Sequence, residues 1–191
     1  MATKVVPAER REELLSGLAG QGLEVGAGTG AAFSFYPTRV TALTAIEPEP
    51  TLRSLALEAA ARAPIAVTVT GASAEATGLP DASCDFVVCS LVLCSVDDVP
   101  AALAELRRVL KPGGELRFYE HVKAPNSLTA AVQSTMDRSG VWPALAGGCH
   151  LARDTERTIS LAGFEIESIH RFTSGPRSVG VPFLLGRARR D

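Results

Sequence analysis

The sequence predicts an α/β protein built on a doubly wound, mostly parallel sheet. Short apolar segments alternate with helical patterns from residue 9 to residue 119, which is the order expected of such a sheet. The first apolar segment, 23–25, runs directly into the glycine-rich loop 26–30, as strands do in folds that bind ligands at this turn. The segment 85–90 has no polar face, which is typical of a central strand covered by helices on both sides.

The elements up to residue 119 follow in a regular order. Leucine and alanine recur at helical spacing over 51–62, β-branched residues dominate 65–70, and Lys111-Pro112-Gly113-Gly114 interrupts the chain sharply. The predicted elements are helices over 9–18, 51–62 and 99–110, strands over 23–25, 40–46, 65–70, 85–90 and 115–119, a short segment over 31–36 and a loop over 71–83.

The last third of the chain departs from this alternation. Helices are predicted over 128–139 and 155–162, the second ended by Gly163. Strands over 164–172 and 179–187, joined by a Ser-Gly-Pro turn, predict an antiparallel hairpin at the sheet edge. We expect one domain over 1–191, with a core over 20–122 and closing helices and a hairpin over 123–191.

Composition narrows the function classes. The net charge of −2 gives no reason to expect a nucleic-acid or anionic-membrane partner. No apolar run approaches the roughly 20 residues of a membrane span, so a cytoplasmic protein is expected. The four cysteines lack zinc-ligand spacing, so the sequence predicts no metal site and reduced core thiols instead.

Two acidic residues at strand ends point to the cofactor. The loop also fits the dinucleotide pattern Gly-x-Gly-x-x-Ala, but Glu24 immediately before it would repel a pyrophosphate. The same carboxylate would favour the ammonium and sulfonium of S-adenosylmethionine, and Glu47 after the second strand is placed to accept two ribose hydroxyls. A nicotinamide-dependent oxidoreductase using this loop and a non-catalytic cofactor binder remain the alternatives.

Several motifs in the sequence resemble those of known protein families. Gly26-Ala27-Gly28-Thr29-Gly30, Glu47-Pro48, the run 89–96 and Leu110-Lys111-Pro112-Gly113-Gly114 resemble class I S-adenosylmethionine-dependent methyltransferases, in the branch of the ubiquinone/menaquinone C-methyltransferases. The segments 30–37, 118–122 and 148–155 resemble the methyltransferase-like thiol methyltransferases. The resemblance implies a single Rossmann-like methyltransferase domain, whose seven-stranded, mostly parallel sheet has an antiparallel last strand.

The expected cofactor contacts all follow strand ends. The loop should pass under the methionine portion, Glu24 should lie near its ammonium, and Glu47 should hold the ribose. Ser73 or Ala74 stands where relatives contact the adenine, and the backbone of Ser90 and Leu91 should hold the ammonium and the adenosine edge. The predicted cofactor-binding residues are Glu24, Gly26, Ala27, Gly28, Gly30, Glu47, Pro48, Ser73, Ala74, Ser90 and Leu91.

The acceptor is predicted to be a small molecule, with a thiol slightly favoured over oxygen, nitrogen or carbon. Direct in-line methyl transfer, with S-adenosylhomocysteine as product, needs alignment more than acid/base groups. His121 is the candidate base, Glu120 would orient it or face the acceptor, and His150 beside Cys149 is a weaker candidate. A monomer or homodimer is expected.

Overall fold

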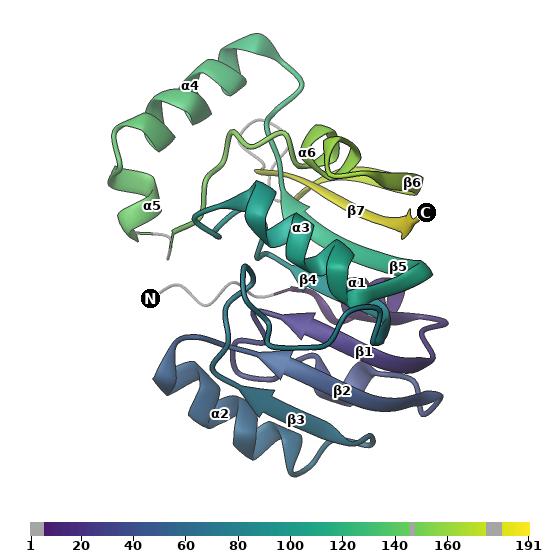
Figure 1. Ribbon diagram of the computed structural model, residues 1–191. Coiled ribbons are helices and arrows are strands. Elements are labelled where there is room, and N and C mark those ends of the chain that lie inside the picture. Colours follow the sequence, from purple (N-terminus) through teal and green to yellow (C-terminus); the bar gives the residue numbers. More distant parts are fainter. Residues whose placement is uncertain (1–5, 146–147, 175–180) are drawn as a thin grey trace.

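The computed structural model describes residues 6–145, 148–174 and 181–191. Its seven strands form one sheet in the order β3-β2-β1-β4-β5-β7-β6. Figure 1 shows the parallel strands β1 to β3 pointing the same way and β7 pointing the opposite way. The strands are β1 (Gly20–Val25), β2 (Val40–Ile46), β3 (Val67–Thr70), β4 (Cys84–Ser90), β5 (Leu110–His121), β6 (Phe164–Ser174) and β7 (Val181–Arg190).

Helices cover both faces of this sheet. One buried cluster contains Leu14 and Leu15 of α1 and Ala56 of α2, and the other contains Leu106 of α3 and Ile159 of α6. In Figure 1, α4 and α5 stand away from the sheet at the top left. The helices are α1 (Ala8–Leu15), η1 (Phe33–Phe35), α2 (Pro50–Ala60), α3 (Val99–Val109), α4 (Ser127–Arg138), α5 (Val141–Leu145) and α6 (Thr155–Leu161). None of the helices in the described ranges is both long enough and apolar enough to cross a membrane.

The predicted fold class is confirmed, with differences at element ends. The second strand has the predicted bounds, whereas β5 begins at Leu110 and runs through the Pro-Gly-Gly sequence. Pairing across a bulge explains this, because Leu110 pairs with Cys84 before regular pairing resumes at Phe86 and Glu115. Helix α5 was not predicted. The predicted strand start at 179 and most of the Ser-Gly-Pro turn lie outside the described residues.

Side-chain caps fix where the helices begin. Glu49 accepts hydrogen bonds from the backbone N–H groups of Thr51 and Leu52 at the start of α2. Asp98, Asn126 and Asp154 cap α3, α4 and α6 in the same manner. Such caps satisfy amides that have no partner inside the helix and typically contribute about 1 kcal/mol each. They also set the chain direction as each helix leaves the carboxyl edge of the sheet.

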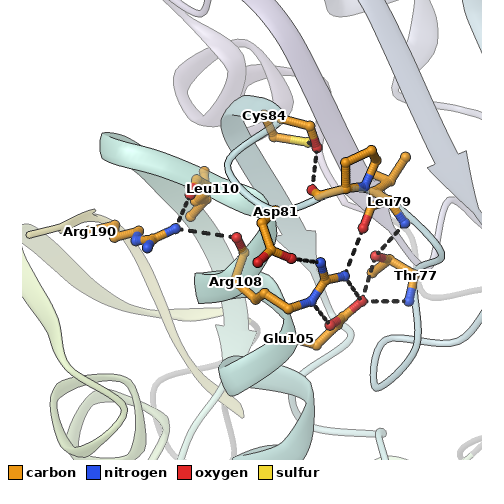
Figure 2. A network of polar contacts seen from close by, with 10 residues as sticks. Thr77, Leu79, Asp81, Cys84, Glu105, Arg108, Leu110 and Arg190 are labelled. Carbon is orange, nitrogen blue, oxygen red and sulfur yellow. Dashed lines mark hydrogen bonds and ion pairs between the residues drawn. The ribbon is translucent and has the colours of Figure 1, made fainter.

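An ionic network attaches the loop after β3 to α3 (Figure 2). Arg108 donates to the Glu105 carboxylate, to Asp81 and, at 2.8 Å, to the carbonyl of Leu79. Glu105 also accepts from the Thr77 amide at 2.9 Å and from its hydroxyl at 2.7 Å. Mainly because of the bond from Arg108, the pKa of Glu105 falls to about 2. The network therefore fixes the segment that follows the predicted adenine contacts.

Candidate functional site

The predicted site residues gather at one edge of the sheet. Strands β1, β2, β3, β4 and β5 are parallel neighbours, so their carboxyl ends meet at this edge. Val25 pairs with both Ile46 and Cys89, and Ser90 pairs with Tyr119. The glycine loop and the residues after β2, β3, β4 and β5 therefore lie side by side, at the edge where open α/β sheets bind ligands.

The three glycines of the loop serve two purposes. All three have positive φ, and a Cβ on Gly26 or Gly30 would clash with Val92 at 2.5 Å or with Ala59 at 2.7 Å. Gly28 differs, because within the described residues, its own chain neighbours apart, no atom lies within 4 Å of the position its Cβ would occupy. Gly26 and Gly30 thus allow close packing of the protein, whereas Gly28 borders open space that a ligand can fill.

Glu47 holds the loop from the neighbouring strand. Its carboxylate is buried and accepts hydrogen bonds from the amides of Gly28 at 2.8 Å and Glu49 at 3.0 Å. Each carboxylate oxygen has a second lone pair, so the group can still accept two hydroxyl hydrogen bonds. Arg53 supports the same turn by donating to the carbonyls of Glu47 and Pro48.

Glu24 is buried without a complete set of partners. Its Oε2 atom and the hydroxyl of Tyr36 both lack a hydrogen-bond partner within the described residues. Burial raises the pKa of Glu24 to about 7, against the opposing effects of the facing Tyr36 hydroxyl and the Arg11 charge. A carboxyl group kept out of water beside the glycine loop fits a cationic ligand group, which would complete its hydrogen bonds. Sequence reasoning assigned no role to Tyr36.

The ends of β3 and β4 complete the predicted cofactor cradle. Leu91 has φ of 60°, an uncommon conformation for a residue with a side chain, and its amide donates to the carbonyl of Tyr119 at 2.7 Å. Such strained residues cluster at functional sites. Ala74 is buried, and Ser73 forms an isolated bridge with Ala76. The predicted adenine contacts therefore lie at a tight turn.

Glu120 is directed away from His121. Its fully buried carboxylate accepts from the amides of Val92 and Leu93 at 2.9 Å and of Cys94 at 3.1 Å. Successive residues of a strand point to opposite faces, which explains why it does not meet its neighbour. Burial raises the pKa of Glu120, although the three amides act in the opposite direction. In the described structure Glu120 thus holds the loop after β4.

His121 lies in a row of aromatic rings that crosses three strands. It is opposite Phe183 on β7, which is opposite Phe172 on β6. The ring centroids are 4.4 Å apart for His121 and Phe183, and 5.7 Å apart for Phe172 and Phe183. Tyr119 packs behind Phe183 at 5.3 Å, and Arg10 lies 4.2 Å over Phe172. This aromatic row (His121, Phe183, Phe172) gives the acceptor end an apolar wall.

A thiol–imidazole cluster (Cys94, His121, Cys149) lies beside the aromatic row. His121 Nδ1 is 3.1 Å from Cys149 Sγ, and one donor atom from each of the three residues lies within 4.8 Å of the others. The histidine that meets Cys149 is therefore His121, whereas His150 lies 3.9 Å from the Asp137 carboxylate. No local pattern predicts this cluster, because its members are 27 and 28 residues apart in the chain.

Two hollows flank the sheet. A cavity of about 340 Å³ lies between the residues after β5 and the ends of β6 and β7, lined by Val122, Arg153 and Phe183 among others. A second cavity, of about 310 Å³, lies at the opposite edge, beside Asp85 and Gly113. Of these two, the first is next to the aromatic row, at the predicted acceptor end.

Comparison with known proteins settles the family. A family model described as a methyltransferase domain matches residues 23–118, half of the chain. The chain belongs to the S-adenosylmethionine-dependent methyltransferase family. It is 38% identical over 146 residues to the thiol S-methyltransferase TMT1B of Rattus norvegicus, which covers 74% of this chain and 59% of that relative. The chain thus spans about three fifths of the length of this curated relative.

Solved structures agree on the fold. A protein from Bacillus halodurans, described as a candidate methyltransferase, superposes with a TM-score of 0.77 at 16% identity, covering 95% of this chain and 97% of that one. The N-methyltransferase NodS from Bradyrhizobium japonicum, solved with S-adenosylhomocysteine, gives a TM-score of 0.70 at 22% identity, covering 95% and 86%. The family uses S-adenosylmethionine, which fits the buried Glu24 carboxyl, whose Oε2 has no partner among the described residues, and the space beside Gly28. The comparisons do not favour a nicotinamide-dependent oxidoreductase.

Proposed function

We propose that this protein transfers a methyl group from S-adenosylmethionine to the sulfur of a small thiol. The observation that carries the proposal is the buried Glu24 carboxyl, whose Oε2 has no hydrogen-bond partner among the described residues, together with relatives named thiol S-methyltransferases. When bound, the cofactor supplies an electrophilic methyl group on a sulfonium. The acceptor loses its proton, its sulfur bonds the methyl carbon, and the bond from methyl to sulfonium breaks, leaving two neutral thioethers.

The chain's own residues would hold the cofactor from three sides. Glu24 receives the ammonium, and Glu47, already bonded to the Gly28 amide, accepts the ribose hydroxyls with Pro48 fixing the turn after it. Loop residues 26–30, including Ala27, run under the methionine portion. Ser73, Ala74, Ser90 and Leu91 border the adenosine.

The acceptor end suits a soft, apolar nucleophile. The aromatic row excludes water from one side, and apolar surroundings favour a reaction that converts charged reactants into neutral products. A thiol with a pKa of about 8.5 needs only about 2 kcal/mol to ionise at neutral pH. His121 is the group in reach of this end that can take the proton, while Glu120 acts as a positioning residue through the loop 92–94.

The cellular location, the partners and the oligomeric state are inferred from the cysteines and the charge balance. All four cysteines are buried in the described fold, as expected of thiols kept reduced in a protein core, so we place the protein in the cytoplasm. The charge balance favours a small-molecule partner over nucleic acid, and a monomer or homodimer suits a site built from one chain.

Two measurements test the proposal. Calorimetric titration with S-adenosylhomocysteine should show binding that Glu47→Ala weakens by about tenfold or more, since hydrogen bonds to charged groups contribute about 1.5–3 kcal/mol each. Glu58→Ala, on the exposed face of α2, is the matched control, and NADH should not compete. Displacement by NADH would refute the cofactor assignment.

The identity of the acceptor atom is tested with two compounds that differ in that atom alone. Thiophenol and phenol, each with S-adenosylmethionine, are followed by the formation of S-adenosylhomocysteine and of the methylated product. We expect turnover with the thiol and about a hundredfold less with the alcohol, because phenol is the weaker acid and nucleophile. Faster methylation of phenol would refute the thiol proposal. With an alkyl thiol of pKa about 8.5 as acceptor, His121→Ala should slow turnover at pH 7 and recover above pH 9, where the thiol ionises unaided.

A further inference from the structure

The thiol–imidazole cluster joins three segments that are remote in sequence and tightly fixed in space. Cys94 follows β4, His121 ends β5, and Cys149 lies in the segment before α6. Both thiols are buried, at 0% and 1% exposure, while His121 is partly exposed. The cluster is therefore closed on the protein side and accessible from the side of the imidazole.

Hydrogen bonds hold the two cysteine segments together. The amide of His150 donates to the carbonyl of Cys94 at 2.7 Å, and Arg153 donates to the carbonyl of Leu93 at 2.6 Å. Asp137 of α4 accepts from the amides of Leu151 and Ala152 at 2.9 and 2.8 Å. From the other side, the Glu120 carboxylate holds the Cys94 amide. The sulfur atoms are thus positioned by the fold and not by a flexible loop alone.

The spacing of the donor atoms suits a small thiophilic cation. Zinc binds thiolate sulfur at about 2.3 Å and imidazole nitrogen at about 2.0–2.1 Å, which places tetrahedral ligands about 3.6–3.8 Å apart. Here His121 Nδ1 and Cys149 Sγ are 3.1 Å apart, and all three donor atoms lie within 4.8 Å of one another. Shifts of about 1 Å or less would bring them to coordination distances. The Ser95 hydroxyl, 3.5 Å from Cys94 Sγ, is placed to support a bound thiolate.

We propose that Cys94, His121 and Cys149 form a three-ligand site for a thiophilic divalent cation such as Zn²⁺. Two thiolates would neutralise the cation, which offsets the cost of burying charge. Three protein ligands leave a fourth position open, as in catalytic zinc sites, whereas structural sites have four. His121 is the partly exposed ligand and also belongs to the aromatic row, so the proposal places the open position on the side of the predicted acceptor end.

The site deepens the function proposed above, and this step rests on it. A thiol that coordinates such a cation loses its proton outright, so the acceptor would arrive as a thiolate near neutral pH. With the cation present, His121 acts as a ligand and no longer as the base. The sulfur still attacks the methyl carbon, and the resulting neutral thioether is a weaker ligand that leaves the site.

Cobalt titration of the full chain tests the site without any activity measurement. The protein, kept reduced with a phosphine, is titrated with Co²⁺ and the sulfur-to-cobalt charge-transfer bands are recorded. We expect one ion per chain, and displacement by Zn²⁺. Cys94→Ser, Cys149→Ser and His121→Ala should each weaken binding by more than about tenfold, since even changes in residues that only support metal ligands cost about 10–100-fold. Cys84→Ala, at the other end of β4, and His170→Ala, on an exposed ion pair with Glu13, should bind like the parent.

The outcomes distinguish a failure of the proposed metal site from a failure of the proposed function. Absence of sulfur-to-cobalt bands, or bands that persist in His121→Ala, would overturn the site, as would a Cys94–Cys149 disulfide in its place. If a cysteine variant fails to fold, the zinc-induced rise in melting temperature of the parent, lost in His121→Ala, gives the same answer. Adding thiophenol to the cobalt form should intensify the charge-transfer bands. Cobalt binding without thiol methylation would refute the proposed function alone.

Discussion

Binding of the cofactor should release a proton from Glu24. Burial raises the pKa of this carboxyl from the usual 4.5 to about 7, so the free protein holds it mostly neutral at pH 6. An ammonium placed beside it favours the ionised form and lowers that pKa again. Complex formation should then release about 0.9 proton at pH 6 and about 0.5 at pH 7.

The assay is calorimetric titration with S-adenosylhomocysteine in two buffers of different ionisation enthalpy, because the difference in apparent heat gives the number of protons released. The ligand amine stays protonated below its pKa of about 8, so the measurement is confined to pH 5.5–7. The Glu24→Gln variant should release almost no protons on binding and should bind S-adenosylhomocysteine more weakly. The Glu58→Gln variant should behave like the parent. Release below about 0.2 proton at pH 6, or unchanged release in Glu24→Gln, would refute the reasoning.

The raised pKa of Glu24 also predicts that this carboxyl lowers the stability of the free protein. Because its folded pKa is raised, the unfolded chain loses this proton first, and stability decreases as pH rises from 4.5 to about 7. The full loss is about 3 kcal/mol, at about 1.4 kcal/mol per pKa unit. Glu24→Gln should therefore raise the unfolding free energy at pH 8 by up to about 3 kcal/mol, and by little near pH 5. Equal stability of parent and variant at pH 8 would contradict this.

Three further predictions concern other residues. Gly28→Ala should abolish binding of S-adenosylhomocysteine. Its cost in stability should be near that of Gly17→Ala, because both glycines have positive φ and free space around the added Cβ. Equal binding by the two variants would refute the role of Gly28. Glu120→Ala should lower the unfolding free energy in urea by about 3 kcal/mol or more, since two buried amides and one partly buried amide lose their acceptor. A loss below about 1 kcal/mol would contradict the anchoring. Glu105→Gln should reduce the loss of stability between pH 4.5 and 2, because the pKa of Glu105 is lowered to about 2 and its ionised form stabilises the fold above that range; an unchanged acid transition would refute it.

Local sequence predicts the cofactor side of the site because its residues follow strand ends directly. Glu24, the glycines and Glu47 are contiguous with β1 and β2, so finding the strands also finds the residues. The same reasoning fails where tertiary pairing overrides local signals. Strand β5 continues through Pro112-Gly113-Gly114 because pairing with β4 begins at Leu110, which no local pattern reveals.

The acceptor side was less predictable for a physical reason. His121 was found because it ends a predicted strand, but its partners come from two loops that only the folded chain brings near it. Spacing rules for metal ligands describe residues on one short motif, so they cannot detect Cys94 and Cys149. The role of Tyr36 is hidden in the same way, since it faces Glu24 from the short segment after the glycine loop.

Two buried glutamates at this edge show how a binding group differs from a structural one. Glu120 is fully buried, and three protein amides occupy its carboxylate oxygens. Glu24 is almost as deeply buried, yet its Oε2 has no donor within the described residues. Burying an unsatisfied carboxyl costs stability, and folding gains nothing from leaving it so. The Tyr36 hydroxyl faces this carboxyl from within the chain, and the ammonium of the cofactor, which the sequence predicts at this position, has the charge and the hydrogens to supply a further donor.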